Sequence, residues 1–323
     1  MSRDLKAKNL DLETGANIIL VNERDAALLN IHPGDRLNAI DGSRSAIAIA
    51  NITDIVPNGI AGVTKNLKDE LRARNGDKIE LAPAEQPKSL VAIKEKINGK
   101  RLGYEEFYEI VKDGLNKRLN NDELTAFVVA LSIYGLDLEE AEYLSNAMIN
   151  TGERLDLGKK RVYDKHSIGG VPGDKTSLLV VPIVASAGLT IPKTSSRAIT
   201  SAAGTADRAE VLMPVTLSTS EMRRIVNKTN GCLVWGGAVH LAPADDMFIK
   251  IEYPLSIDPL LLPSIMSKKR AVGSTDLVLD IPTGETAKIK TREEASLLVK
   301  DFITLGERMH ISIRGAVTNG QQP

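Results

Sequence analysis

The spacing of apolar residues changes twice along this chain, and each spacing requires a different kind of fold. Up to about residue 84 the apolar residues form short runs separated by turn sequences such as Asp41-Gly42. Runs bounded in this way are typical of β-strands joined by tight turns. The sequence therefore predicts a small β-rich domain over residues 1–84. Its strand candidates are Ile18–Val21, Leu37–Ile40, Ala46–Ile52 and Lys78–Leu81.

Helical spacing begins after a polar segment that contains Pro83 and Pro87. From residue 104 to 149 apolar residues recur at every third or fourth position, which is the spacing of helices with one buried face. Asp122 and Asp137 stand where the N-caps of two of these helices belong. We therefore predict a helical bundle domain over residues 85–160.

Strand and helix patterns alternate in residues 161–323. The strand-like runs are 189–191, 232–235, 277–281 and 311–313, and the helical patterns are 221–227 and 293–305. The apolar run 178–187 fits either type, and we interpret it as a helix although it contains Pro182. Such alternation predicts an α/β domain with a largely parallel sheet. Because loop-like sequence follows the last strand, we expect the natural domain to continue beyond Pro323.

Charge and cysteine content exclude several classes of partner. The 41 basic residues nearly balance the 42 acidic ones, so there is no general positive field for nucleic acid or a membrane surface. One cysteine and four scattered histidines predict neither a disulfide nor a metal site, and we expect no cofactor. The chain shows no signal peptide and no apolar stretch of spanning length. We therefore expect a cytoplasmic protein with a small-molecule ligand.

The segment from Asp164 to Ser177, DKHSIGGVPGDKTS, has the composition of an anion-binding loop. Glycines allow backbone N–H groups to converge on an oxyanion, while lysine and hydroxyl side chains add charge and hydrogen bonds. It is not a Walker A sequence, because Asp174 separates Gly173 from Lys175. Taken alone, a segment of this kind is also explained as a solvated loop.

A second segment, Thr194 to Asp207, reads TSSRAITSAAGTAD and is dense in small hydroxyl residues. Serine and threonine favour capped turns, so a turn is the simpler interpretation. The alternative is a second wall of a phosphate pocket, with Ser195 and Thr205 as donors and Arg197 close to the anion. Two such loops in one domain make the phosphate pocket the favoured hypothesis.

Together the two segments resemble the signature of the thymidine/pyrimidine nucleoside phosphorylases, and in particular the archaeal AMP phosphorylase branch of that family. The helical segment 104–152 and the sequence DPLLLPSIMSKK at 258–269 continue the resemblance, which covers the chain from about 95 to the end. The first 84 residues resemble the additional double-psi-barrel-like domain of the archaeal members. The resemblance implies an α/β fold of the nucleoside phosphorylase/phosphoribosyltransferase type. This fold would comprise a helical bundle joined by about 242–270, an α/β domain, an N-terminal small β-barrel-like domain and a further C-terminal domain absent here.

The activity that the resemblance implies is phosphorolysis of nucleoside 5′-monophosphates. AMP and phosphate would give adenine and ribose 1,5-bisphosphate in nucleotide degradation, with CMP and UMP as further candidate substrates. The enzyme must fix phosphate beneath C1′ and neutralise the base as it leaves. Members of the family are homodimers or larger, so a homo-oligomer is implied as well.

The resemblance also assigns residues. Asp258 would protonate the departing base, although SIDP is equally a good helix-start sequence, so a cap is the alternative. Apart from the resemblance, the substrate phosphate needs further cations, and the candidates are Arg197, Lys268 and the pair Lys288 and Lys290, although alternating lysines usually face solvent. The residues predicted to bind phosphate or substrate are Lys165, His166, Ser167, Gly169, Gly170, Ser195, Ser196, Arg197, Ala198, Ile199, Thr200, Ser201, Thr205, Ser264, Lys268, Lys288 and Lys290.

Three other functions remain open at this stage. The first is a thymidine or pyrimidine nucleoside phosphorylase, although the arginine that holds the pyrimidine in those enzymes is missing from residues 249–254. The second is a phosphoribosyltransferase, for which Asp245-Asp246 is the candidate magnesium-binding pair. The third is a non-catalytic, truncated nucleotide-binding protein.

Overall fold

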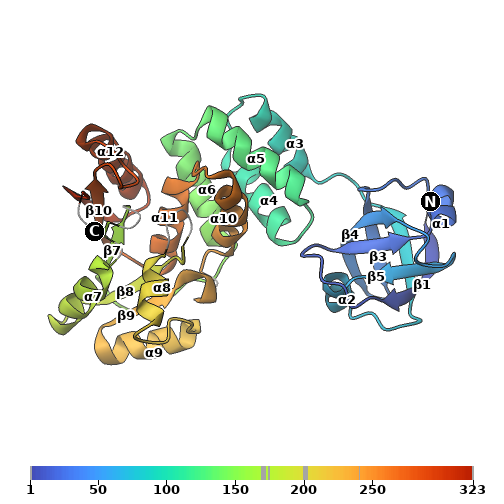
Figure 1. Ribbon diagram of the computed structural model, residues 1–323, viewed down its shortest axis with the longest axis horizontal. Helices are drawn as coiled ribbons and strands as arrows, with labels where there is room; N and C mark the ends of the chain where they lie inside the picture. Colours follow the sequence, from blue (N-terminus) through green and yellow to red (C-terminus); the bar gives the residue numbers. More distant parts are fainter. Residues whose placement is uncertain (1, 169–171, 174, 199–202, 240, 322–323) are drawn as a thin grey trace. The chain divides into compact units, whose positions relative to one another are not determined.

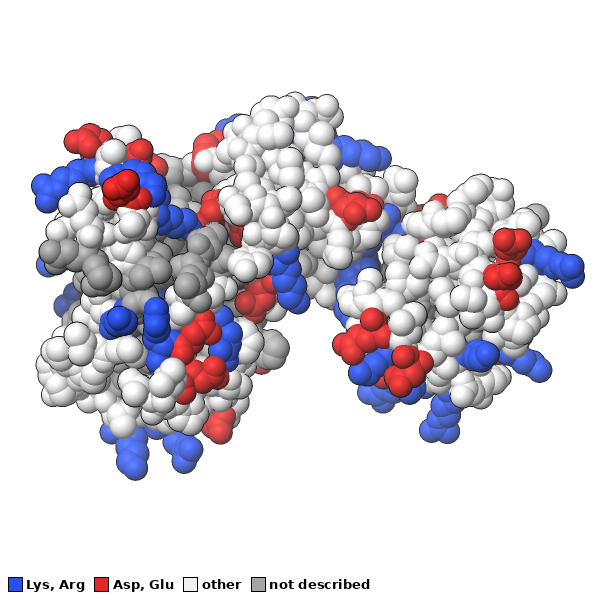
Figure 2. Space-filling model, viewed as in Figure 1, with Lys and Arg blue, Asp and Glu red and all other residues white. Residues whose placement is uncertain are grey.

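The computed structural model describes residues 2–168, 172–173, 175–198, 203–239 and 241–321. The chain divides into two compact units, Met1–Val91 with Asp113–Glu123, and Ala92–Lys112 with Leu124–Pro323 (Figure 1). The domain limits at residues 84 and 160 stay predictions. On the face drawn in Figure 2, basic and acidic side chains are interspersed on both units, in keeping with the near balance of charges in the sequence.

The β-rich segment forms a closed barrel whose strand order is β1-β5-β2-β4-β3-β6. Small buried residues such as Ala39, Ala48 and Ala61 fill its interior, which suits a narrow barrel. Closure pairs every strand on both sides and leaves no sheet edge. The bounds are β1 Arg3–Asn9, β2 Ile18–Val21, β3 Arg36–Asp41, β4 Arg44–Ile52, β5 Ile60–Val63 and β6 Lys78–Pro83, with helices α1 Glu23–Leu29 and α2 Lys65–Leu71.

The predicted barrel-like domain is confirmed, but the sequence pattern did not predict two of its strands, β1 and β5. In β1 only Leu5 and Ala7 are buried, and lysines and an aspartate alternate with them. In β5 the run is only four residues long and contains Gly62, whose place leaves no room for a side chain against Leu20. Polar alternation and a strand glycine both weaken the signal that marks a strand in sequence.

The helical bundle consists of consecutive helices together with two later ones. Phe127 packs edge-to-face against Phe107, with ring centroids 6.3 Å apart, and at a tilt against Phe248, 5.9 Å away, so α5 contacts both α4 and α10. Helix α11 packs on α6. The bounds are α3 Lys88–Ile97, α4 Tyr104–Leu115, α5 Asn121–Tyr134, α6 Leu138–Asn150, α10 Pro243–Leu255 and α11 Leu261–Ala271.

The α/β part is built on parallel strand pairs, as predicted, but they form two sheets. One sheet has the order β11-β10-β7 and the other is the pair β8-β9. Helix α12 buries Phe302 and Leu305 against Leu279 and Ile313 of the first sheet. The bounds are β7 Tyr163–Ser167, α7 Thr176–Ser186, β8 Ile191–Ser195, α8 Thr205–Glu210, α9 Thr219–Thr229, β9 Gly231–Trp235, β10 Asp276–Thr283, α12 Arg292–Arg308 and β11 Ser312–Asn319.

The run 178–187 is helical, as interpreted, and lies in α7 with Pro182 inside it. The strand expected at 189–191 begins only at Ile191. The largest difference is at β7, whose sequence Tyr-Asp-Lys-His-Ser we interpreted as the start of a loop. This strand is buried through ion pairs rather than apolar contacts, so its pattern gave no strand signal.

One of the two predicted N-caps is confirmed and the other is wrong. Asp137 caps α6, and its Oδ1 accepts the N–H groups of Glu139 and Glu140 at 2.9 Å each. Asp122 lies inside the first turn of α5, and the cap is Asn120, whose Oδ1 accepts the N–H of Glu123 at 2.9 Å.

We expect Asp137→Ala to lower the free energy of unfolding by roughly 1–2 kcal/mol, because two helix N–H groups lose their acceptor. The matched variant Asp122→Ala should lower it by less than about 0.5 kcal/mol, since Asp122 contributes only a first-turn charge. Urea titration of both variants at neutral pH measures the difference. Equal losses would contradict the assignment of the cap.

Candidate functional site

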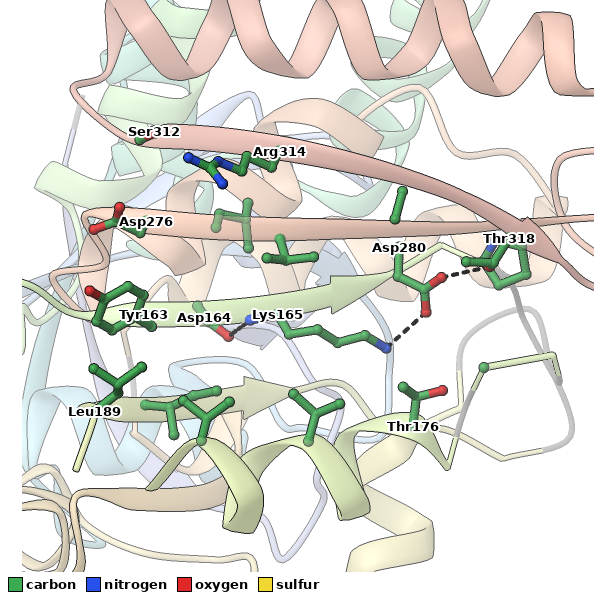
Figure 3. Close-up of a pocket in the computed structure, with 18 of the residues that line it drawn as sticks. Tyr163, Asp164, Lys165, Thr176, Leu189, Asp276, Asp280, Ser312, Arg314 and Thr318 are labelled. Atoms are coloured by element: carbon green, nitrogen blue, oxygen red, sulfur yellow. Dashed lines mark hydrogen bonds and ion pairs between the residues drawn. The ribbon is translucent and has the colours of Figure 1, made fainter. Parts of the chain in front are cut away.

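The carboxyl ends of β7 and β10 bring Lys165, Ser167 and Asp280 together. Asp280 stands directly across from Ser167 in the parallel ladder, and its Oδ2 accepts the Ser167 hydroxyl at 3.0 Å. The same oxygen lies 3.0 Å from Lys165 Nζ, and Oδ1 accepts the Thr318 hydroxyl at 2.7 Å (Figure 3). Ligands of open parallel sheets bind at this edge. The predicted pair Lys165 and Ser167 therefore lies in a suitable place.

The Lys165 ammonium is buried and incompletely satisfied. Its side chain is 5% exposed, and Nζ makes no hydrogen bond of good geometry to any described atom besides the ion pair with Asp280. Burial lowers the pKa of Lys165, and the charge of Asp280 offsets only part of this effect. An anion that accepts the remaining ammonium protons would relieve this cost.

The glycine-rich loop returns to the same place. Gly173 has a φ of +83°, and a Cβ added there would lie 2.6 Å from Ser167 Oγ and 3.4 Å from Asp280 Oδ2. Only a glycine accepts this backbone conformation and this close approach without strain. Gly169 and Gly170 of the same loop lie outside the described residues.

A cavity of about 790 Å³ lies between α7 and the sheet β11-β10-β7. Val180, Val184 and Leu189 make much of its wall apolar, and Lys165 with Asp280 stand at one end (Figure 3). Among the described residues predicted to bind phosphate or substrate, Lys165 alone lines it. The cavity is therefore not the place at which those residues converge.

Four lysines surround His166. Burial, followed by the charges of these lysines, holds the pKa of the His166 imidazole well below its usual value. A neutral imidazole can donate or accept a hydrogen bond, but it adds no charge. The four are Lys165 of β7, Lys193 of β8, and Lys268 and Lys269 of α11.

Two of these lysines are held by carboxylates that come from other elements. Lys269 Nζ lies 2.8 Å from Asp164 Oδ2, and both side chains are almost fully buried. Lys268 Nζ lies 2.7 Å from Asp245 Oδ2 and 3.2 Å from the predicted Ser264, one helical turn earlier in α11. Asp245 is thus engaged with a lysine rather than presented for a magnesium ion. Among the residues that the structure describes, no group of three or more potential metal ligands occurs.

The second predicted loop is fastened at both ends by Asp207. Its Oδ2 accepts the N–H of Ala198 at 2.8 Å and that of Gly204 at 2.9 Å, on either side of the undescribed residues. Arg197 pairs with Glu210 and Asp207, which raise its pKa, and lies over the Trp235 ring at 4.8 Å. The Arg197 charge is therefore already compensated in the free protein.

The remaining residues of this loop follow β8 or open α8. Ser195 is the last residue of β8, and its hydroxyl donates to the Ser196 carbonyl at 3.4 Å. Thr205 is the first residue of α8, whose N-cap is Gly204. Ile199, Thr200 and Ser201 lie outside the described residues.

Asp258 lies between α10 and α11 and forms an ion pair with Lys288, so the structure brings these two predicted residues together. Lys290 is directed elsewhere, because its Nζ donates to the Glu285 carbonyl at 2.6 Å. Glu252 of α10 is 4% exposed, and its Oε1 accepts the N–H of Leu260 at 3.3 Å. Burial, followed by the charge of Asp258, raises the pKa of Glu252 to about 8.

Four charged residues of this site were not among those predicted from the sequence, namely Asp164, Lys193, Lys269 and Asp280. Asp164 precedes Lys165 and Lys269 follows Lys268, so a second charge beside a predicted lysine was the available signal. Lys193 and Asp280 had no such signal. Asp245 was predicted only as half of a magnesium-binding pair, whereas the structure pairs it with Lys268.

No helix among the described residues has the length and apolar character needed to span a membrane. The fold itself resembles a solved structure. Anthranilate phosphoribosyltransferase from Thermus thermophilus has a TM-score of 0.57 and 20% identity, with coverage of 72% of this chain and 67% of that one. This similarity supports the architecture and nothing about the ligand.

Archaeal relatives named AMP phosphorylase match almost the entire chain. The relative from Thermococcus sibiricus is 50% identical over 320 residues, which are 98% of this chain and 64% of the relative. The relative from Methanocaldococcus jannaschii is 47% identical over 322 residues, 99% of this chain and 64% of the relative. The chain thus spans slightly less than two thirds of their length. The resemblance indicated by the two loop segments is confirmed.

Two family models match in the order that the sequence predicts. The helical bundle domain of the glycosyl transferase family matches residues 91–152, and the a/b domain of the same family matches residues 159–314. The matched segments contain the helices α4 to α6 and the strands β7 to β10 described above. The chain therefore belongs to this glycosyl transferase family.

Proposed function

We propose that this protein catalyses phosphorolysis of AMP, giving adenine and ribose 1,5-bisphosphate. The observation that carries the proposal is the group of four lysines around His166, contributed by β7, β8 and α11. Strand β8 leads directly into the second predicted loop, residues 194–207, which is called the serine-rich loop below. Such a group suits a phosphate nucleophile, which has to be bound as an anion and fixed in position. The relatives named AMP phosphorylase supply the substrate class.

In this proposal the two halves of the site have opposite electrical tasks. Lys165, Ser167, Ser195 and Thr205 hold phosphate, with Ser264 and Lys268 beside them. A phosphate oxygen attacks C1′ as the C1′–N bond breaks, and the electron pair of that bond leaves with the base. Asp258 donates the proton that neutralises the departing base. In this arrangement the positively charged side chains lie below the ribose and the acid Asp258 lies above it.

The ion pair between Asp258 and Lys288 links the substrate phosphate to this acid. A carboxyl group that is paired with a lysine accepts hydrogen bonds, so it must release Lys288 before it can act as a donor. The 5′-phosphate is a dianion that competes for the same lysine. Glu252, which carries a proton near neutral pH because of its raised pKa, stands next to Asp258 as a proton reserve for the carboxyl pair.

The remaining predicted residues keep their proposed roles. Gly169, Gly170 and the loop from Ser195 to Ser201 contribute backbone and hydroxyl donors, and His166 a neutral contact. Lys290 is a second candidate for the 5′-phosphate. CMP and UMP are proposed as further substrates. By resemblance to the family we also propose a homodimer or larger assembly in the cytoplasm that acts on small molecules.

A nucleoside phosphorylase is the second candidate, since it needs the same phosphate site. The engaged position of Lys288 favours the nucleotide, because a lysine held beside the proposed acid serves no purpose for a substrate without a 5′-phosphate. The two functions differ in one measurable respect, the effect of removing that phosphate from the substrate.

The first test is chromatographic detection of free base after incubation with inorganic phosphate and either AMP or adenosine. We expect adenine from AMP, and a fall in kcat of roughly 10²- to 10⁴-fold in Asp258→Asn, which retains the shape but cannot protonate the base. The exposed Asp301→Asn of α12 is the matched control. Release from adenosine at the same rate would sink the nucleotide assignment, and full activity of Asp258→Asn would exclude it as the acid.

The second test compares the two lysines that are candidates for the 5′-phosphate. Lys288→Met should raise KM for AMP roughly tenfold to a hundredfold, because one charge-assisted contact contributes about 1.5–3 kcal/mol. Lys290→Met should change KM less, since its ammonium is directed to a carbonyl. The exposed Lys300→Met provides the baseline. An unchanged KM in Lys288→Met would remove Lys288 from the substrate site.

The third test concerns Glu252 and pH. A carboxyl whose pKa is about 8 in the folded protein and near 4.3 when unfolded contributes stability that is present at pH 4 and lost as pH rises to 8. Glu252→Gln should therefore flatten the stability profile between these limits and leave the variant more stable than the parent at pH 9. Denaturant titration at pH 5, 7 and 9 measures this. A parallel profile in the variant would show that Glu252 does not hold the proton.

A further inference from the structure

Lys193 lies in the middle of β8. It is the one of the four lysines around His166 to which no role has been assigned above, apart from Lys269, which pairs with Asp164. Lys193 is 2% exposed, and its Nζ donates to the Thr194 carbonyl at 2.5 Å. Lys269 Nζ donates to the same carbonyl oxygen at 3.4 Å. Two lysine Nζ atoms from different elements therefore meet at one backbone oxygen, in the strand that leads into the serine-rich loop.

The direction of the strand places Lys193 toward the phosphate residues. Alternate residues of a strand share a face, so Lys193 and Ser195 lie on the same side of β8. Lys193 also acts electrostatically on His166 of β7, the neighbour of Lys165 and Ser167. Lys193 therefore shares the face of β8 that carries Ser195 and is close enough to His166 of β7 to lower the pKa of its imidazole.

The four lysines around His166 have fewer carboxylate partners than members. Three of them have a carboxylate within ion-pair distance, but Lys193 has none among the described residues. A buried ammonium without a counter-ion is costly. If Lys193 were charged, the group would therefore have one cation in excess, which a bound anion would balance. The pairs are Lys165 with Asp280 at 3.0 Å, Lys268 with Asp245 at 2.7 Å and Lys269 with Asp164 at 2.8 Å.

A second buried atom points to the same kind of ligand. Lys165 Nζ lacks a hydrogen bond of good geometry to any described atom, so it retains protons for an acceptor. Two lysines of the group, on adjacent parts of β7 and β8, thus have unused donor capacity. A phosphate ion carries enough acceptor oxygens to serve both.

We propose that Lys193 is a further cation of the phosphate site and that it takes up a proton from solvent when phosphate binds. The proposal rests on the function proposed above and deepens it. The step converts the neutral amine of Lys193 to an ammonium, with the proton supplied by the buffer and the phosphate entering as its dianion. Before phosphate binds, the neutral Lys193 amine therefore avoids the cost of an unpaired buried charge.

The surroundings of Lys193 support a neutral amine in the empty site. Burial, followed by the charge of Lys269, holds the pKa of Lys193 well below its usual value. Lys165 of β7 and Lys268 of α11 act in the same sense, and Asp164 of β7 opposes them. His166 is the remaining titratable neighbour, and its own pKa is held well below its usual value. A dianion bound beside the amine would reverse this balance, because it favours the charged form.

The sign of the pH dependence follows from this linkage. Binding that takes up a proton weakens as pH rises, so phosphate affinity should fall above neutral pH. Without Lys193 this part of the pH dependence disappears. A lysine that only anchors the Thr194 carbonyl would not produce such a difference.

The test is calorimetric titration of the full chain with inorganic phosphate and with sulfate at pH 7.5, in two buffers of different ionisation enthalpy. Sulfate does not titrate in this range, so any proton uptake on its binding belongs to the protein. We expect uptake in the parent protein, and in Lys193→Met a loss of that uptake with a tenfold to hundredfold weaker affinity. Thermal unfolding should show that Lys193→Met is at least as stable as the parent. The exposed Lys300→Met is the control.

The outcomes separate this inference from the proposed function. If Lys193→Met binds phosphate as tightly as the parent protein and with the same proton uptake, Lys193 has no part in the site, while the phosphate site itself stands. If affinity falls but uptake persists, the proton goes elsewhere and the linkage is overturned. If the parent protein binds no phosphate, the proposed phosphate site and this inference fail together. If Lys193→Met is unstable, Lys193→Gln, which retains a polar group for the Thr194 carbonyl, is measured in its place under the same criteria.

Discussion

The buried ion pair between Lys269 and Asp164 is the contact on which the rest of the site depends. Their side chains are 1% and 0% exposed, so each charge is stable only because the other is present. Breaking a buried pair of this kind costs about 3–5 kcal/mol. The pair fixes α11 to β7 and thereby sets the position of Lys268 beside Lys269 and of Lys165 beside Asp164. Four charges of the site are placed by one contact.

This arrangement explains how several lysines can be concentrated in a protein interior. Each of three ammonium groups faces a carboxylate from a different element, so Coulomb attraction offsets the cost of removing both charges from water. Arg197 follows the same rule nearer the surface, where Glu210 and Asp207 compensate it and Trp235 lies beneath it. Its sequence neighbours suggest an anion contact, whereas its partners give it a role in holding the loop.

The sequence predicts helices and strands correctly where they are marked by apolar periodicity, as in α6, α12 and β10. It does not predict elements that are held in place by buried ion pairs. Strand β7 is polar by composition, and its partner Asp280 is 113 residues away from Ser167, a distance over which no local pattern gives a register. The error at Asp122 has a different origin, because Asn120 and Asp122 are both acceptable caps and only the backbone decides between them. The predicted lysines and serines were selected by their types, but their carboxylate partners required coordinates.

The two ends of the site have a common property. At the proposed phosphate end Lys193 is buried with no carboxylate partner among the described residues, and at the proposed base end Glu252 is buried beside Asp258. In both, burial favours the neutral form. A free protein that keeps these groups neutral avoids the cost of isolated buried charges. A phosphate dianion at one end would then favour protonation of Lys193. At the other end, a departing base would draw a proton from the carboxyl pair of Glu252 and Asp258. In the proposed site, ligand charge and protein protonation would thus be coupled, because the low-dielectric interior disfavours charges that have no partner.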